Sequence, residues 1–456
     1  MLSPLSNPIY ARLFAAQVVA LLGTGLTTVA LALLAYDLAG GNAGVVLGIA
    51  LTIKMVAYVT LSPLAATLAQ RVPRRTFLVG LDVARAGAVA CLPLVTEVWQ
   101  IYVLIFAMQA CSAGFTPTFQ ATIPDVLEDE AEYTKALSLS RLAYDLESVL
   151  SPMLAAAALL VMSSSALFGL NSVGFLISAA LVLSVVLPMR QPAMDDGGFL
   201  ARAMFGVRAY LATPRLRGLL ALSMAVSAAG SMVIVNTVVY VRSYLGLGEQ
   251  ETAIVLMAFG GGSMVAALAL PPVLARVSDR AAMITGAVVM TAALACGMAM
   301  PGLALVMVIW FVIGLGFSIV QVPGGRLLRR SSSESDRPAY FAAQFSLSHA
   351  CWLVCYPLAG WLGSRFGLTA AFAVLCVIAV AAIVTALMVW PKDDPEVLAH
   401  THEAMEHDHL HVHDEHHQHE HEGWEGPEPH AHPHRHPKTR HSHGFVIDAH
   451  HRRWPT

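Results

Sequence analysis

Histidine is concentrated near one end of this sequence. Eighteen of the nineteen histidines lie between His400 and His451, interspersed with acidic, small and proline residues. Imidazole suits Ni²⁺, Co²⁺, Cu²⁺ and Zn²⁺ as a ligand, and it is neutral near pH 7. The spacing therefore predicts a tail that binds transition metals. Its candidate ligands are His400, His402, His407, His409, His411, His413, His416, His417, His419, His421, His430, His432, His434, His436, His441 and His443.

The spacing within the tail indicates how it would bind. Residues two apart in an extended chain point the same way and lie about 6–7 Å apart, so the alternating run from His407 can fold around one or more ions. Many ligand sets are nearly equivalent, which predicts variable stoichiometry and selectivity in the Irving–Williams order. With few large apolar side chains, residues 391–456 are expected to be disordered without metal. A cloning tag and a solvated tail without a role are the alternatives.

The rest of the chain predicts an all-α membrane protein. The sequence is 56% hydrophobic and 12% charged, whereas soluble proteins are roughly 25% charged. A spanning helix needs about 20 mostly apolar residues. Twelve such transmembrane segments lie near residues 9–36, 44–69, 76–95, 99–122, 137–161, 167–189, 218–242, 251–274, 282–300, 303–322, 339–362 and 369–390.

Basic residues predict the orientation of these segments. Lys and Arg gather in alternate loops, and the loops between them hold only Arg242 and Arg365. The positive-inside rule therefore predicts that both termini, and with them the histidine tail, lie in the cytoplasm. We expect a multi-pass protein of the bacterial cytoplasmic (inner) membrane whose first span serves as an uncleaved signal. The six cysteines fall within predicted spans, so structural disulfides are not expected.

Two parts of the sequence resemble each other. The segment Leu68–Arg75 after the second span matches Leu274–Arg280 after the eighth, and Ser138–Arg141 matches Ser346–His349. Duplicated six-helix halves are how secondary transporters of this size are built. The expected organisation is a first half, a cytoplasmic linker, a second half and the tail, at residues 1–189, 190–217, 218–390 and 391–456.

The loop after the second span resembles a family signature. Ala66–Arg75 is similar to the G-x-L-A-D-R-x-G-R-R motif of the major facilitator superfamily (MFS), with Ala66 in place of the glycine and Gln70 in place of the acid. In the family that acid helps to latch a cytoplasmic gate, so Asp82 and Arg85, three residues apart, are a candidate substitute pair. The resemblance implies gate roles for Gln70, Arg71, Arg74, Arg75, Asp82 and Arg85.

Other segments resemble particular branches of that superfamily. Similarity to the branch of macrolide and siderophore exporters lies in Phe115–Pro117, Ile123–Asp125, Asn171–Phe175 and Tyr210–Arg217. Similarity to the NreB-type nickel-resistance exporters lies in the histidine tail and in Ala35–Asn42, Leu142–Ser148 and Phe345–Trp352. This resemblance covers essentially the whole chain and implies export of nickel.

Ionisable residues inside spans mark a pathway or a paired structural site, because each costs about 2.5–3.5 kcal/mol on insertion scales. Arg141 and Asp145 in the fifth span are four residues apart and share a helix face, which favours an ion pair. Glu147 lies on a different face of the same helix. Either carboxylate is a candidate for metal or proton handling, and the other would be structural.

Histidine, cysteine and lysine supply the remaining candidates. His349 stands alone among the histidines outside the tail, at the repeat position of Arg141; a packing role is the alternative to a ligand role. Cys351 and Cys355 share a helix face that does not include His349. Lys54 would neutralise a carboxylate or repel cations as a gate, and the structural role is favoured. The full set of path and coupling candidates is Asp145, Glu147, His349, Arg141, Lys54, Cys351 and Cys355.

Together these features predict a transporter and not an enzyme. No P-loop motif is present, so energy is expected from an ion gradient. We expect a monomer that exports a divalent transition metal, nickel first and cobalt second, in exchange for protons. Its partners would be metal, protons and the lipid bilayer, without nucleic acid. Ni²⁺ (or Co²⁺ or Zn²⁺) would be substrate and tail ligand, with no tightly bound cofactor. The rivals are a drug, macrolide or siderophore exporter and a non-transporting metal buffer or sensor.

The tail generates a prediction on pH. Ligand imidazoles with pKa values near 6.5 compete with protons, so Ni²⁺ bound to the full-length protein should fall steeply between about pH 7 and pH 5. Equilibrium dialysis measures the bound ion, and a truncation after Pro395 is the control. Equal binding by the truncated protein would contradict the prediction.

Overall fold

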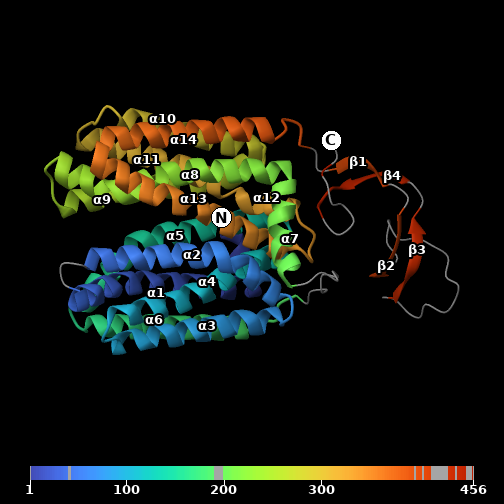
Figure 1. Ribbon diagram of the computed structural model, residues 1–456, viewed down its shortest axis with the longest axis horizontal. Helices are drawn as coiled ribbons and strands as arrows, with labels where there is room; N and C mark the ends of the chain where they lie inside the picture. Colours follow the sequence, from blue (N-terminus) through green and yellow to red (C-terminus); the bar gives the residue numbers. More distant parts are fainter. Residues whose placement is uncertain are drawn as a thin grey trace.

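The chain folds mainly into long helices that lie side by side in two groups (Figure 1). The computed structural model describes residues 2–39, 43–188, 199–394, 397–402, 405–411, 430–436, 439–447 and 454. The first group contains six long helices, preceded by a short 3₁₀ turn at Ser3–Ser6 and interrupted by another at Leu92–Leu94. They are α1 (Pro8–Ala39), α2 (Ala43–Ala69), α3 (Arg74–Cys91), α4 (Val98–Val126), α5 (Glu130–Leu159) and α6 (Ser164–Leu183).

The second group repeats this arrangement. A π-helical turn, Val239–Tyr244, extends its first long helix, and a short helix, α12 (Gly324–Arg330), precedes its fifth. The long helices are α8 (Pro214–Val238), α9 (Glu249–Leu274), α10 (Asp279–Gly297), α11 (Leu303–Gln321), α13 (Arg337–Phe366) and α14 (Leu368–Val389). Each of the twelve predicted segments thus coincides with a helix.

Hydropathy separates two of these twelve helices from the others. Within the described ranges, ten helices are long and apolar enough to cross a membrane. The remaining two, α5 and α13, carry Arg141, Asp145, Glu147 and His349, whereas Lys54 lies on α2 and the Asp82–Arg85 pair on α3. All path and coupling candidates except Lys54 thus lie on the two helices that are not apolar enough to be counted with the ten.

The stretch expected as a linker is partly helical. Helix α7 (Phe199–Ala212) lies within it, and α8 already begins at Pro214 because proline suits the first position of a helix. A Cβ atom on Gly206 would lie 2.3 Å from the carbonyl oxygen of Ala339, so α7 packs closely on the start of α13. We call the end of the bundle that carries α7 the linker end (Figure 1).

Parts of the tail, expected to be disordered without metal, have strand backbone. Strand β1 (Val397–His402) pairs antiparallel with β4 (Thr439–Gly444), and β2 (Met405–His411) pairs antiparallel with β3 (His430–His436). Five predicted ligands lie outside the described residues, namely His413, His416, His417, His419 and His421.

Glycine permits the closest helix crossing of the second half. A Cβ atom on Gly314 in α11 would lie 1.9 Å from the carbonyl oxygen of Phe259, and one on Gly262 in α9 would lie 1.9 Å from that of Phe311. Small residues allow helix backbones to approach each other in membranes, where packing holds helices together. The α9–α11 contact therefore depends on reciprocal glycines.

This crossing generates a stability prediction. Gly314→Ala should destabilise the protein by about 1–3 kcal/mol, because the added methyl group overlaps a backbone carbonyl that cannot rotate away. Thermal unfolding of the detergent-solubilised protein measures the effect. The matched control is Gly48→Ala, at a helical position where an added Cβ meets nothing within 4 Å. Equal unfolding temperatures for Gly314→Ala and the wild type would refute it.

Candidate functional site

A cavity of about 680 Å³ lies between the two halves. Its walls come from all six long helices of the first half, α1 to α6, and from α8, α11, α12 and α13 of the second. Cavities of about 300–1,000 Å³ are typical of small-molecule sites in proteins.

Five of the residues predicted from the sequence line this cavity: the path candidates Lys54, Arg141, Glu147 and His349, and the gate candidate Arg85. Arg141 and His349, the repeat counterparts, thus reach the same space from α5 and α13. The two cysteines do not line it. Both are buried, and the Cys355 Sγ lies 3.7 Å from the Met224 Sδ on α8. The structure therefore separates His349 from the thiols.

The ring of His349 has a defined orientation. Its Nδ1 lies 2.7 Å from the carbonyl oxygen of Phe345, which only accepts hydrogen bonds, so Nδ1 carries the proton and donates it. The ring also makes an edge contact with Tyr58, with centroids 4.9 Å apart. In the neutral ring Nε2 then keeps its lone pair, as in metal-binding histidines whose other nitrogen is held by a carbonyl group.

Glu147 and Lys54 are the other ionisable groups on the wall. The Glu147 carboxylate packs over Gly25 of α1, where an added Cβ would lie 2.5 Å from its Oε1. The Lys54 Nζ lies 5.6 Å from the ring centroid of Tyr58, and its charge acts on Glu147 and His349. Among described residues Lys54 has no ion pair within 4 Å, and the carboxylate that its charge acts on is Glu147 of helix α5.

Asp145 occupies a different environment from Glu147. It forms the predicted ion pair with Arg141, whose Nε lies 3.2 Å from the Asp145 Oδ2. The same Nε lies 3.1 Å from the Ser263 Oγ on α9, and the guanidinium lies 4.9 Å from the ring centroid of Phe317 on α11. The pair therefore contributes to the junction of the halves, and Glu147 is the carboxylate on the cavity wall.

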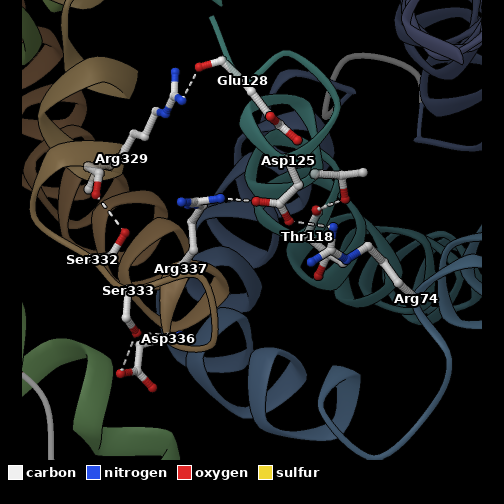
Figure 2. A network of polar contacts seen from close by, with 11 residues as sticks. Arg74, Thr118, Asp125, Glu128, Arg329, Ser332, Ser333, Asp336 and Arg337 are labelled. Atoms are coloured by element: carbon white, nitrogen blue, oxygen red, sulfur yellow. Dashed lines mark hydrogen bonds and ion pairs between the residues drawn. The ribbon is translucent and has the colours of Figure 1, made fainter. Parts of the chain in front are cut away.

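A second group of charges joins the halves at the linker end. The carboxylate of Asp125, at the end of α4, accepts a hydrogen bond from Arg74 at 2.7 Å and another from Arg337 (Figure 2). Arg74 begins α3 in the first half, whereas Arg337 begins α13 in the second. All three side chains are at most 13% exposed. One buried carboxylate thus holds a guanidinium from each half.

Neighbouring contacts reinforce this closure. Arg326 of α12 pairs with Glu130 of α5 at 2.6 Å and with Asp279 of α10 at 3.2 Å. Arg329 donates to the backbone oxygen of Glu128 (Figure 2). Deeper in the bundle, Ser346 of α13 donates to the carbonyl oxygen of Val59 on α2 at 2.5 Å. The halves are therefore tied together at the linker end.

The predicted substitute latch lies elsewhere. Asp82 and Arg85 form a buried ion pair, Ser178 donates to Asp82 at 2.8 Å, and the guanidinium lies 4.0 Å from the ring centroid of Phe115. All of these residues belong to the first half, so this pair does not join the halves. Asp125 forms that link instead, together with Arg337, which the sequence analysis had not singled out.

The other predicted gate residues contact nearby groups. Arg71 lies 5.6 Å from the ring centroid of Phe199 on α7, and Arg75 donates to the carbonyl oxygen of Val185 at 3.5 Å. Gln70 is partly buried at the end of α2. Of the predicted gate residues, Arg74 is thus the one in the network around Asp125.

Comparison with known proteins explains the repeated halves. The sequence profile of the Major Facilitator Superfamily matches residues 13–219 and again residues 219–419. The chain belongs to the Major Facilitator Superfamily. It is therefore a multi-pass membrane transporter driven by a gradient, and not an enzyme.

Relatives within the superfamily are distant. The chain is 22% identical over 337 residues to the uncharacterized MFS-type transporter YfiS of Bacillus subtilis, which covers 72% of this chain and 80% of YfiS. It is 26% identical over 136 residues to macrolide efflux protein A of Enterococcus faecalis, covering 29% of this chain and 42% of that protein.

Solved MFS structures share the fold. A bacterial homologue of the iron transporter ferroportin, in an outward-facing state, superposes with a TM-score of 0.68 at 14% identity, covering 84% of this chain and 98% of that one. The human organic anion transporter MFSD10 superposes with the same TM-score of 0.68 at 13% identity, covering 83% and 98%.

The Asp125 network generates a prediction on gating. Asp125→Asn leaves two buried guanidinium groups without their anion, a loss of about 3–5 kcal/mol in buried pairs, so the linker end should open. A cysteine placed at Ser346, in a background without the natural cysteines, should react with a maleimide roughly tenfold faster or more.

The control is Glu132→Gln at the same end of the bundle, because Glu132 contacts Lys135 and Ser3 within its own half. If Ser346→Cys reacts with the maleimide at the same rate with and without Asp125→Asn, Asp125 does not hold the halves together.

Proposed function

We propose that this MFS transporter exports a divalent transition metal from the cytoplasm in exchange for protons and so confers metal resistance. Nickel is the first candidate and cobalt the second. The observation that carries the proposal is the distribution of histidine: eighteen lie between His400 and His451, and the remaining one, His349, lines the cavity. Imidazole is the ligand that these metals share.

The cavity supports weak, reversible binding. His349 offers Nε2, and Glu147 offers a carboxylate on the opposite half. The described residues include no group of three His, Cys, Asp or Glu suited to hold a metal ion. Two protein ligands, with water and amide oxygens such as that of Gln109 completing the coordination, allow release, whereas four thiolates would trap the ion.

Glu147 and Lys54 support coupling to protons. A carboxylate must lose its proton to bind a cation, so metal and proton compete for Glu147. The ammonium of Lys54 interacts electrostatically with Glu147 and would repel a cation that arrives while Glu147 is protonated. Exchange of metal for protons follows from that competition.

The tail register supports a role in collecting metal. Four rungs of the paired strands place histidine opposite histidine: His400 and His441, His407 and His434, His409 and His432, and His411 and His430. The last three pairs follow one another at intervals of two residues along β2 and β3.

A second candidate function is export of a small amphipathic organic molecule. The supporting observation is the cavity itself, since about 680 Å³ exceeds the needs of a bare ion and its walls include the aromatic rings of Tyr58, Tyr144, Trp352 and Tyr356. Similarity to macrolide efflux proteins is consistent with this candidate.

The test uses everted membrane vesicles, in which export appears as uptake. An acid-inside gradient should drive ⁶³Ni²⁺ uptake by the wild type. Glu147→Gln should reduce the gradient-driven rate roughly tenfold or more even at saturating metal, because the competition with protons is lost. His349→Ala should raise the half-saturating Ni²⁺ concentration about tenfold, the effect of losing one ligand contact worth ~1.4 kcal/mol.

The matched control is Cys355→Ala, on the same helix as His349 but outside the cavity wall, and it should leave uptake unchanged. Absence of gradient-driven Ni²⁺ uptake by the wild type would reject metal export. Macrolide tolerance conferred by expression would then favour the organic substrate. Metal retention with neither activity would indicate a buffer or sensor.

A further inference from the structure

The end of the chain, beyond the histidine-rich stretch at residues 400–443, returns to the helix bundle. Phe445 and Ile447 are only 3% and 4% exposed and belong to the apolar core of the second half. The hydroxyl group of Tyr340 on α13 donates to the carbonyl oxygen of Ile447 at 2.8 Å. The rings of Phe445 and Trp454 meet edge to face with centroids 5.1 Å apart. Three apolar residues of a polar tail are thus seated on the protein.

A buried arginine lies where the two ends of that stretch meet. The guanidinium of Arg215, at the start of α8, is 1% exposed and lies 4.9 Å from the ring centroid of Trp454. Its Nε lies 3.4 Å from the carboxylate of Asp394, which also pairs with Arg330 and accepts from the Trp390 Nε1 at 3.2 Å. Asp394 precedes the histidine-rich stretch and Trp454 follows it, so one cation contacts both ends.

We propose that Phe445, Ile447 and Trp454 form an intramolecular anchor that docks on the starts of α8 and α13 and closes the histidine-rich stretch into a loop. Burial of two apolar side chains and a cation–π contact with a desolvated guanidinium stabilise the docked state. Val446, between the buried pair, is partly buried and more exposed than its two neighbours, as expected where alternate residues of an extended segment face the protein.

The anchor has a consequence for the paired strands. The first rung of the ladder joins Val397 to Gly444, which directly precedes Phe445. An isolated two-stranded hairpin is marginally stable, and closing a long loop costs entropy. Fixing both ends at Arg215 removes much of that entropic cost and specifies the register.

Register decides which residues face each other across the ladder. A slip of one residue in the pairing places His407, His409 and His411 opposite non-histidine residues. We therefore expect the anchored tail to bind metal more tightly than a detached one. This second step rests on the metal-collecting role of the tail in the proposed function.

Limited proteolysis of the full-length protein tests the anchor without any metal or substrate. Trypsin cleaves after Arg452 and Arg453, next to Trp454, and docking should protect these bonds. The double variant Phe445→Ser/Ile447→Ser should be cleaved there roughly tenfold faster or more, because two buried apolar contacts are lost. Val446→Ser is the matched control and should be cleaved at the wild-type rate.

Tyr340→Phe is a separate variant that tests the anchor even if the double variant misfolds. It removes one hydroxyl group from a buried ring and keeps the packing. It should accelerate cleavage several-fold by releasing the Ile447 carbonyl oxygen. Equal cleavage rates in the wild type, Tyr340→Phe and the double variant would overturn the anchor.

Titration of the same proteins with Ni²⁺ tests the consequence. The double variant should bind Ni²⁺ about tenfold more weakly than the wild type and Val446→Ser. Faster cleavage with unchanged Ni²⁺ affinity would overturn the link between anchor and register while supporting the anchor. A wild-type tail without affinity for Ni²⁺ would reject its proposed metal-collecting role, and cleavage rates would still report on docking.

Discussion

Closure of the bundle depends on one carboxylate held between two guanidinium groups. Asp125 accepts from Arg74 and Arg337, which belong to different halves, and all three side chains are largely removed from solvent. Removing one member of a buried charged group costs far more than an exposed ion pair contributes. The halves separate here only when Arg337 leaves Asp125, which keeps its pair with Arg74 in the first half. Together with the Arg326–Glu130 pair and the Arg329–Glu128 contact, this group ties the two halves together at the linker end.

Pairing divides the other intramembrane charges into two classes. Asp82 with Arg85 and Asp145 with Arg141 each form an ion pair, which offsets the cost of burying charge and leaves these residues to fix helix positions. Lys54 and Glu147 line the same cavity as Arg85 and Arg141, but they interact with each other without an ion pair among described residues. Charges held in that way respond to an arriving ion or proton. They are the groups on which exchange would act.

Local patterns predicted more than distant ones did. The twelve helices followed from apolar segments of spanning length, and the Arg141–Asp145 pair followed from a spacing of four within one helix. Asp125 and Arg337 belong to different halves, so no periodicity links them, and Gln70 in the position of the usual acid directed attention to Asp82. Docking of Phe445 and Ile447 on the bundle could not be predicted for a similar reason, because two apolar residues in a polar tail form no periodic pattern. Their partners lie in helices that begin more than a hundred residues earlier.

The Asp125–Arg337 contact and the tail anchor both involve helix α13, so a movement of this helix affects both. Tyr340 lies three residues after Arg337 at the start of α13, so one helical turn carries both the guanidinium that pairs with Asp125 and the hydroxyl group that holds Ile447. Arg215 and Arg330, which fix the other end of the histidine-rich stretch through Asp394, belong to the same half. Any movement that separates Arg337 from Asp125 therefore carries the anchored tail with the second half. The tail stays beside the opening instead of being stretched across it.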